Sequence, residues 1–306
     1  MDPLQALPVE DWPVLRDSLR RYWPIYACYY HWAVNAINWK AKDPRSAWSI
    51  YCPGGKYDPG SGTFIATASN GQYTVVVFTF EESKYQLQEV ITHSNIIDWN
   101  QEIVFSMVHE HFKDVLKDAI KRKAIMMNIG LVPVEKSPAI IYFKPKDECL
   151  KFDFEVPDEC YLGPVDVSHI PLVTSLWPHR NRKNIKLSEK YLETFVKLNR
   201  SAGLFLKEDN SLVSWILYSD YGSLGQLQTV EKYKRKGYGK LVTKALVKEL
   251  AEKDGLNSTL FIVKDNIVSH RLFSSLGYRP LNEVNKIVVQ QSNIHLDKDD
   301  IEIKGP

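Results

Sequence analysis

The sequence lacks any apolar run long enough to cross a bilayer. Over its 306 residues, no uninterrupted apolar stretch approaches the roughly 18 residues that a membrane-spanning helix needs. The first residues, Met1, Asp2 and Pro3, precede two acidic side chains, a pattern unlike a secretory signal or an Arg-rich mitochondrial presequence. We therefore expect a cytoplasmic protein that does not bind membranes, and the pattern leaves a mitochondrial location open.

Cysteine is also scarce. The four cysteines contain no Cys-x-x-Cys pair, and no His-x-x-x-His pair accompanies them. A disulfide scaffold and a structural zinc site both need such patterns, so we expect reduced thiols and no metal. The four positions are Cys28, Cys52, Cys149 and Cys160.

The first half of the chain shows a mixture of helix and strand patterns. The segment 144–158 is polar and interrupted by prolines, and we place a domain boundary there. The sequence predicts a mixed α/β domain over 1–155, a second domain over 156–291 and a polar tail over 292–306. In the first domain we expect helices at 10–22 and 108–123, and strands at 48–52, 63–69, 73–80 and 139–143.

The second half has a clearer order of elements. Residues 239–253 have the apolar spacing of an amphipathic helix, and 260–263 form an unbroken apolar run typical of a buried parallel strand. The pattern predicts an α/β (α+β) fold. We expect further helices at 168–176, 187–198 and after Asn266, and strands at 204–207, 212–218, 224–230 and 286–290.

One segment carries a binding signal. A strand ending at Val230 leads into a basic turn and then into Gly237-Tyr238-Gly239, which open a helix. The first turn of a helix has unpaired N–H groups and a positive dipole end, and glycine lets an anion approach the backbone. The segment therefore predicts a pyrophosphate site, although a solvated basic turn or a nucleic-acid patch would show similar charge. The cations are Lys234, Arg235, Lys236 and Lys240.

Two motifs at this point resemble the GNAT N-acyltransferases. Residues 234–239 resemble the family's Gln/Arg-x-x-Gly-x-Gly/Ala motif. Residues 266–278 resemble its closing Asn-x-x-Ser-x-x-Leu-Tyr-x-x-x-Gly-Phe pattern. Segments 97–100, 166–169, 172–173, 213–215 and 229–233 are similar to the glycine N-acyltransferase-like branch. The resemblance implies a GNAT fold in the C-terminal half. We interpret residues 1–155 as a companion domain that walls the acceptor site, with a degenerate copy of the GNAT fold as one interpretation of its origin.

The resemblance also implies how acyl-CoA, acetyl or longer, would bind. The strands 224–230 and 260–263 would hold it where they diverge, with the backbone of Thr229 and Val230 on the pantetheine. The turn residues Lys234, Arg235, Lys236, Gly237, Tyr238, Gly239 and Lys240 would hold the pyrophosphate. Asn266 would contact the pantetheine or serve only as a helix cap.

The chemistry of the reaction leaves the catalytic residues unassigned. The amine must lose a proton and the thiolate must gain one, but Phe273 occupies the place of the tyrosine that serves many relatives as the acid. The nearest titratable groups are Asp220, Glu231, Asp265 and His270. For each of them we expect a surface or capping role, with catalysis as the alternative. We expect Trp215 and Tyr218 in the core, and the alternative is that they line an acyl or acceptor pocket. We expect His169 to cap its helix or pack within it.

Three functional classes are compatible with this pattern. The first is an N-acyltransferase that acts on the amine of a small acceptor, glycine or another amino acid. The second is a protein N-acetyltransferase, and the third is an acyl-CoA-binding protein with little turnover. We expect no nucleic-acid partner, because no DNA-reading module surrounds the basic cluster. The acyl length, the acceptor and the oligomeric state are not fixed by the sequence.

Overall fold

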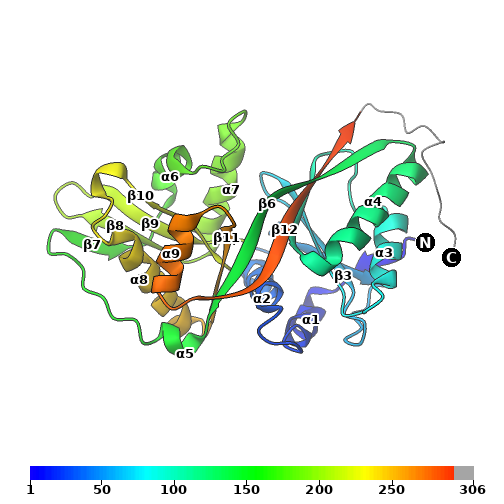
Figure 1. Ribbon diagram of the computed structural model, residues 1–306, viewed down its shortest axis with the longest axis horizontal. Coiled ribbons are helices and arrows are strands. Elements are labelled where there is room, and N and C mark those ends of the chain that lie inside the picture. The colour runs from blue at the N-terminus through cyan, green and yellow to red at the C-terminus, as the bar shows by residue number, and fades with distance from the viewer. Residues whose placement is uncertain (293–306) are drawn as a thin grey trace. The chain divides into compact units, whose positions relative to one another are not determined.

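The computed structural model describes residues 1–292, and the chain in it divides into two compact units (Figure 1). Neither unit is one continuous stretch of sequence. The predicted tail lies outside the described residues from position 293 onward. Unit 1 contains Met1–Leu15, Ala47–Pro138 and 284–292, and unit 2 contains Arg16–Ser46 and Ala139–Glu283.

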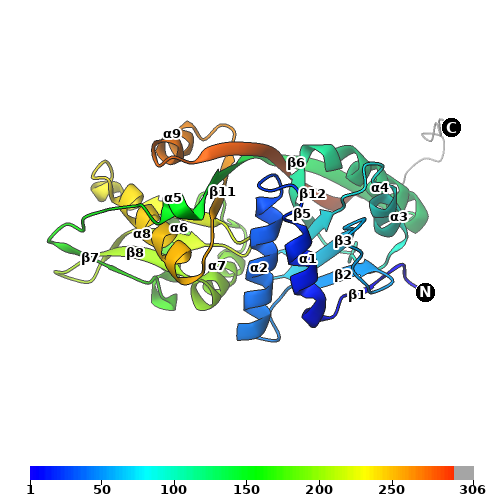
Figure 2. The same cartoon turned by 90° about the horizontal axis from the view of Figure 1, so that it is seen from below.

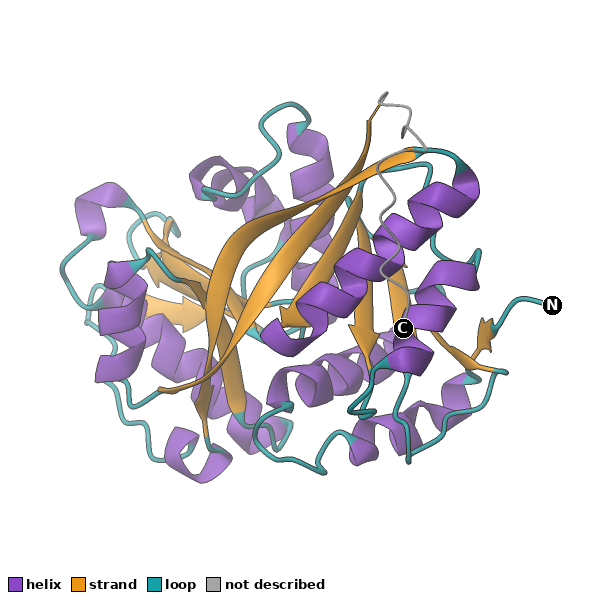
Figure 3. Cartoon of the chain, turned by 45° about the vertical axis from the view of Figure 1, so that its right-hand side comes forward, coloured by secondary structure: helices purple, strands orange, loops and turns teal. Residues whose placement is uncertain are grey.

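Unit 1 contains a sheet in the order β1-β2-β3-β4-β5-β12, in which β4 and β5 are parallel and the other neighbours antiparallel. The helices α3 and α4 pack against each other over this sheet (Figures 1 and 3). The bounds are β1 Leu4–Ala6, β2 Ser49–Pro53, β3 Phe64–Ser69, β4 Tyr73–Phe78, α3 Tyr85–His93, β5 Ile103–His109, α4 Lys113–Met127 and β12 Arg279–Ser292.

Unit 2 contains a sheet in the order β6-β11-β10-β9-β8-β7, in which β10 and β11 are parallel. The helix α8 packs against β8, β9 and β10 (Figure 2). The bounds are α2 Ala27–Lys42, β6 Gly130–Lys144, α5 Lys146–Cys149, β7 Cys160–Gly163, α6 Ile170–Leu176, α7 Ile185–Leu198, β8 Ser201–Leu206, β9 Leu212–Tyr218, β10 Leu224–Thr229, α8 Tyr238–Lys253, β11 Ser258–Val263 and α9 Ile267–Ser275. A further helix, α1 Trp12–Ser18, spans the boundary between the units.

The two units repeat one order of elements. In unit 1 the chain runs β4–α3–β5–α4–β6, and in the second half it runs β10–α8–β11–α9–β12. The last strand of each repeat completes the sheet of the other unit, because β6 pairs with β11 and β12 pairs with β5. The chain is therefore a tandem of two related α/β folds whose final strands are exchanged.

Most predicted elements of the second half are confirmed within one to three residues. In the first half, the predicted hairpin at 63–80 is confirmed, but the helix predicted from Val108 is wrong at its start. Val108 belongs to β5, and α4 begins at Lys113. The strand is favoured by the β-branched and aromatic residues between 103 and 108. The helices α2 and α3 were not predicted from the sequence.

The helix α2 lies early in the sequence but packs in unit 2. Asn35 donates from Nδ2 to the backbone oxygen of Asp220 at 3.1 Å. Trp39 donates from its indole nitrogen to Oδ1 of Asn199 at 2.7 Å, and Asn199 in turn donates to the backbone oxygen of Tyr218 at 2.8 Å. The predicted boundary near residue 155 places one domain entirely before the other in the sequence. The compact units are not consecutive in this way, because the early segment Arg16–Ser46 belongs to unit 2.

The turn between β9 and β10 touches the backbone of α2. Gly222 has φ +63°, and a Cβ at this position would lie 2.2 Å from the backbone oxygen of His31. We expect Gly222→Ala to destabilise the protein by more than Gly255→Ala, which has a similar φ of +66° and no atom within 4 Å. Left-handed strain alone costs about 1–2 kcal/mol, and overpacking adds about 1–3 kcal/mol. Urea unfolding of both variants measures the difference, and equal losses would contradict the close approach.

Candidate functional site

The parallel strands β10 and β11 diverge almost at once. Within the described residues their pairing is registered only at Leu224 and Leu260. Beyond that pair, β10 continues along β9, and β11 continues along β6 as far as Val263 opposite Ala139. We call this arrangement the strand fork, with the Leu224–Leu260 pair as its vertex. The facing edges of the two strands consequently keep backbone groups that the ladder does not use.

A bulge in β10 lies next to the vertex. Gly225 is opposite Leu217 and Gln228 is opposite Trp215, so two residues of β10 face one residue of β9. Gln226 within the bulge has φ +50°. A bulge bends its strand and leaves one residue outside the ladder. In this case it directs β10 away from its parallel neighbour and exposes backbone polar groups to the fork.

At its open end, the fork meets the start of α8. Leu241 donates the first helical hydrogen bond to the oxygen of Gly237 at 3.1 Å, and the described structure contains no side-chain cap at this end. The N–H groups of the first turn therefore have no intrahelical acceptor. Arg235 has φ +63° and Gly237 has φ +84°, the alternating backbone typical of an anion-binding nest. No atom lies within 4 Å of a Cβ built on Gly237.

Cations surround this helix start. Lys234 forms an ion pair with Glu231 at 2.6 Å, with the lysine side chain half exposed. The ammonium of Lys236 lies 5.6 Å from the centre of the Tyr233 ring. One of the predicted cations is thus partly neutralised, but the turn keeps a positive excess. Its exposed cations are Lys232, Lys234, Arg235, Lys236 and Lys240.

The structure refines how three of the predicted residues can act. Val230 donates its N–H to the oxygen of Val213 at 2.9 Å, so this N–H is not available to a ligand. Strand alternation turns the backbone groups of Thr229 the other way, toward the fork. Tyr238 has a buried ring, and burial together with Cys160 and Glu159 raises its pKa to about 12. It can offer a ligand its backbone but not its hydroxyl.

Asn266 is a helix cap in this structure. Its side-chain oxygen accepts from the N–H of Ser269 at 3.1 Å at the start of α9. The capping alternative is therefore confirmed, and contact with pantetheine stays a prediction.

Phe273 lies in the core. Its side chain is 5% exposed and packs edge-to-face on Tyr278 at 5.4 Å. The hydroxyl of Tyr278 is also buried and shares a 2.6 Å hydrogen bond with Ser258. Neither ring can donate a proton in the fork from this position.

Asp220 is not a surface group, contrary to the role we expected for it. Its residue is 3% exposed, and Oδ1 accepts a hydrogen bond from the hydroxyl of Tyr191 at 3.0 Å. Burial followed by the charge of Asp220 holds the pKa of Tyr191 well above its usual value. The ring of Tyr221 meets Phe261 of β11 at 6.3 Å and 80°.

The other titratable candidates have structural partners or are exposed. Glu231 pairs with Lys234, and Asp265 is exposed. His270 shares a 2.9 Å hydrogen bond with the hydroxyl of Tyr142 and contacts the oxygen of Lys264 at 3.2 Å. That carbonyl can only accept, so Nε2 carries the proton and Nδ1 accepts from Tyr142.

The two predicted core aromatics and the predicted cap have the expected placement. Trp215 and Tyr218 are both buried. His169 accepts the N–H of Asp166 at 3.1 Å and forms a capping box with it.

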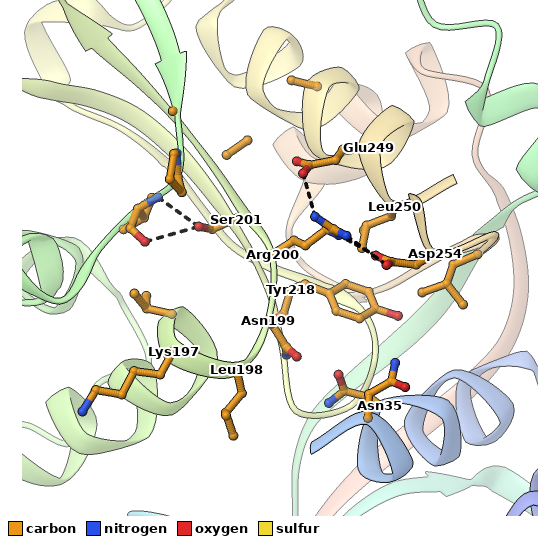
Figure 4. Close-up of a pocket in the computed structure, with 18 of the residues that line it drawn as sticks. Asn35, Lys197, Leu198, Asn199, Arg200, Ser201, Tyr218, Glu249, Leu250 and Asp254 are labelled. Carbon is orange, nitrogen blue, oxygen red and sulfur yellow. Dashed lines mark hydrogen bonds and ion pairs between the residues drawn. The ribbon is translucent and has the colours of Figure 1, made fainter. Parts of the chain in front are cut away.

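A separate cavity of about 930 Å³ lies beside the C-terminal half of α8 (Figure 4). Arg200 extends along its wall and is held by Glu249 at 2.9 Å and Asp254 at 2.6 Å. The cavity lining includes Tyr218 but none of the residues predicted to bind CoA. It is therefore distinct from the strand fork.

Unit 1 has a corresponding helix start with different chemistry. In this unit Glu81 accepts the N–H of Gln86 through a carboxylate oxygen at 2.9 Å, and Ser83 accepts the N–H of Tyr85 at 3.3 Å. The protein's own carboxylate thus occupies the place where an anion would bind at α3. The turn 79–84 contains no glycine.

The described residues contain no group of three or more His, Cys, Asp or Glu side chains placed to hold a metal ion. Within the same residues no helix is both long and apolar enough to cross a membrane. The four cysteines are buried thiols that form no disulfide, and burial raises the pKa of Cys28, Cys52 and Cys149 to about 12. Such thiols stay protonated and unreactive at neutral pH.

Comparisons with known proteins agree with this geometry. Residues 201–287, which contain the fork and both motifs, match the family model of FR47-like proteins. By this match the chain resembles the GNAT N-acyltransferase superfamily. Within it, the chain resembles the glycine N-acyltransferase-like branch. Residues 15–119 match a separate model, described as a domain of unknown function, DUF5645.

Two human proteins illustrate the GNAT relationship in sequence. Glycine N-acyltransferase-like protein 2 of Homo sapiens is 25% identical over 217 residues, which cover 68% of this chain and 70% of that protein. Glycine N-acyltransferase-like protein 1 of Homo sapiens is 21% identical over 222 residues, which cover 67% and 70%.

Two solved structures share the fold. A crystal structure of a Drosophila protein has a TM-score of 0.82 at 20% identity and covers 95% of this chain and 99% of its own. A tandem GNAT protein from the clavulanic acid biosynthesis pathway has a TM-score of 0.53 at 11% identity, covering 94% and 98%. The tandem arrangement agrees with the repeated order of elements in the two units.

The burial of Phe273 generates a prediction about stability. We expect Phe273→Tyr to lower the free energy of unfolding by about 1–3 kcal/mol, because the new hydroxyl would be buried without a partner. Phe154→Tyr, at a half-buried position, is the control and should change stability little. Thermal unfolding measures both variants. Unchanged stability together with faster thiol release in Phe273→Tyr would show instead that this ring reaches the reacting atoms.

Proposed function

We propose that unit 2 transfers an acyl group from acyl-CoA to the amine of a small acceptor such as glycine or another amino acid. The observation that carries the proposal is the strand fork leading to an uncapped helix start surrounded by cations. The resemblance of residues 201–287 to FR47-like proteins supports acyl-CoA as the donor, and the resemblance to glycine N-acyltransferase-like proteins supports a small amine as the acceptor.

The residues present fit the chemistry of coenzyme A. The pyrophosphate would be held by the N–H groups at 237–240 and by Lys234, Arg235, Lys236 and Lys240. The pantetheine would lie along β10, where the backbone of Thr229 and the bulge at Gln226 face the fork. Acyl-CoA supplies an activated thioester carbonyl, and an N–H freed by the bulge is suited to polarise it. Proximity of a bound amine then accounts for much of the acceleration.

The position of Phe273 favours a second candidate function. A buried phenyl ring at the place of the family tyrosine removes one source of a proton for the leaving thiolate. General acid catalysis commonly contributes about 10²–10⁴-fold. An acyl-CoA-binding protein with little turnover is therefore the alternative that this residue favours.

The charge of the turn generates a binding prediction. Replacing Lys234, Arg235 and Lys236 together with alanine should weaken acetyl-CoA binding by at least roughly 100-fold, because each hydrogen bond to a charged group contributes about 1.5–3 kcal/mol and the loss of two already costs about 3 kcal/mol. Alanine at Lys183, Lys186 and Lys190 removes the same charge from exposed positions elsewhere in unit 2. Titration calorimetry should show near-normal affinity in this control.

Activity separates the two candidates. Thiol release measured over a matrix of acyl-CoAs and amines should identify a small amine that is acylated by the unmodified protein. Tight acetyl-CoA binding without thiol release for any amine would favour the binding protein. Equal acetyl-CoA affinity in the turn variant and the control would contradict the placement of the site itself.

A further inference from the structure

The cavity beside the C-terminal half of α8 has the size of a small-molecule site (Figure 4). Its volume of about 930 Å³ lies within the roughly 300–1,000 Å³ typical of ligand pockets. The residues that line it come from α2, from the segment 154–165, from the junction of α7 and β8, from the end of β9 and from α8 with the turn after it, and they all belong to unit 2. The cavity lies toward the opposite end of α8 from the basic turn, so a ligand in it would not compete for the strand fork.

The charged groups of the cavity wall are paired or exposed. Both carboxylates of the described lining, Glu249 and Asp254, bind Arg200, at 2.9 Å and 2.6 Å (Figure 4). The two lysines of the same lining, Lys42 and Lys197, are exposed to solvent. Within this part of the structure, a charged ligand would lose hydration without meeting a buried and unpaired charge of opposite sign.

Two uncharged polar side chains of the wall are also bonded to the protein itself. Oδ1 of Asn199 accepts from the indole of Trp39 at 2.7 Å, and Nδ2 donates to the backbone oxygen of Tyr218 at 2.8 Å. The hydroxyl of Ser201 accepts from the N–H of Val165 at 2.9 Å and donates to the oxygen of the same residue at 3.4 Å. These groups consequently have little hydrogen-bonding capacity left for a ligand.

The hydroxyl of Tyr218 differs from these groups. Tyr218 is 5% exposed, and its hydroxyl oxygen is buried without a hydrogen-bond partner among the described residues. Burial, followed by the negative charge of Asp254, raises the pKa of Tyr218 far above its usual value, so the hydroxyl keeps its proton and can donate it. Figure 4 shows the ring between Arg200 and Asn35, two other residues of the wall. A buried donor of this kind gains free energy from any acceptor that reaches it.

We propose that this cavity binds an uncharged aliphatic carbonyl compound, such as an amide, whose oxygen accepts from the Tyr218 hydroxyl and whose alkyl part packs on the apolar wall. The proposal is independent of acyl transfer in the strand fork. The apolar wall includes Phe154, Leu162, Val196, Leu198, Leu250 and Leu256.

The test uses three probes that share one alkyl chain and differ in their head group. Hexanamide is neutral, whereas hexanoate is an anion and hexylamine a cation at neutral pH. Calorimetry measures the binding of each probe to the full chain, with and without saturating CoA. Tyr218→Phe keeps the ring and removes only the hydroxyl. Tyr161→Phe is the matched control, because it removes a hydroxyl that bonds to Asn210 at 3.0 Å outside the cavity.

We expect hexanamide to bind the unmodified protein, and the two charged probes to bind at least about tenfold more weakly because their desolvation is not compensated. Tyr218→Phe should lower the hexanamide affinity about fivefold, as for the loss of one neutral hydrogen bond, and Tyr161→Phe should leave it unchanged. Saturating CoA should not alter hexanamide binding. Without a probe, Tyr218→Phe should melt no lower than the unmodified protein, because the hydroxyl it loses has no partner in the protein.

Several results would overturn the proposed site. Hexanamide that fails to bind, or that binds Tyr218→Phe as tightly as the unmodified protein, would remove the role of the hydroxyl. Tighter binding of hexanoate or hexylamine would contradict the neutral class of ligand. Loss of hexanamide binding at saturating CoA would place the probe in the strand fork instead.

Discussion

The separation of β10 from β11 is the constraint on which the rest of the site depends. Parallel strands that stayed paired would satisfy each other's backbone groups and offer nothing to a ligand. In unit 2 the two-against-one bulge at Gln226 bends β10, and pairing is registered only at Leu224 and Leu260. After this divergence β10 leads to the N-terminal end of α8. Backbone groups without a partner in the ladder are therefore followed along the chain by helix N–H groups without an intrahelical acceptor.

The two units show how the same order of elements can present helix starts of different chemistry. Both have a helix that follows a strand and precedes its parallel neighbour. At α3 the carboxylate of Glu81 accepts a first-turn N–H, whereas at α8 a nest with Gly237 leaves the first turn uncapped. The difference lies in a few turn residues, since the strand order of the two sheets is the same.

The basic turn and the helix start that follows it were predictable from the sequence because their determinants are local. Glycines, cations and a helix start fall within about ten consecutive residues, and the helix bounds were predicted to within one residue at 238–253. The position of α2 could not be read in this way. It depends on hydrogen bonds between residues as far apart as Asn35 and Asp220, a separation of 185. The exchange of β6 and β12 is likewise a matter of long-range pairing, which local patterns do not encode.

Asp220 illustrates the same limit at the level of a single side chain. Next to serine and tyrosine in a turn, it had the pattern of a surface residue, and its partner Tyr191 lies 29 positions earlier on another helix. Phe273 is a contrasting case. Its motif position was correct, but only the packing on Tyr278 shows that its ring is turned into the core.

Amide hydrogen exchange with and without acetyl-CoA tests the central claim most directly, because it reports on both units in one measurement. The claim is that acyl-CoA binds in the strand fork of unit 2 and not at the corresponding helix start of unit 1. We predict that acetyl-CoA slows exchange in peptides covering 226–230 and 235–240, and leaves peptides covering 76–86 unchanged. Protection at 76–86, or no protection at 226–240 at saturating acetyl-CoA, would contradict the account.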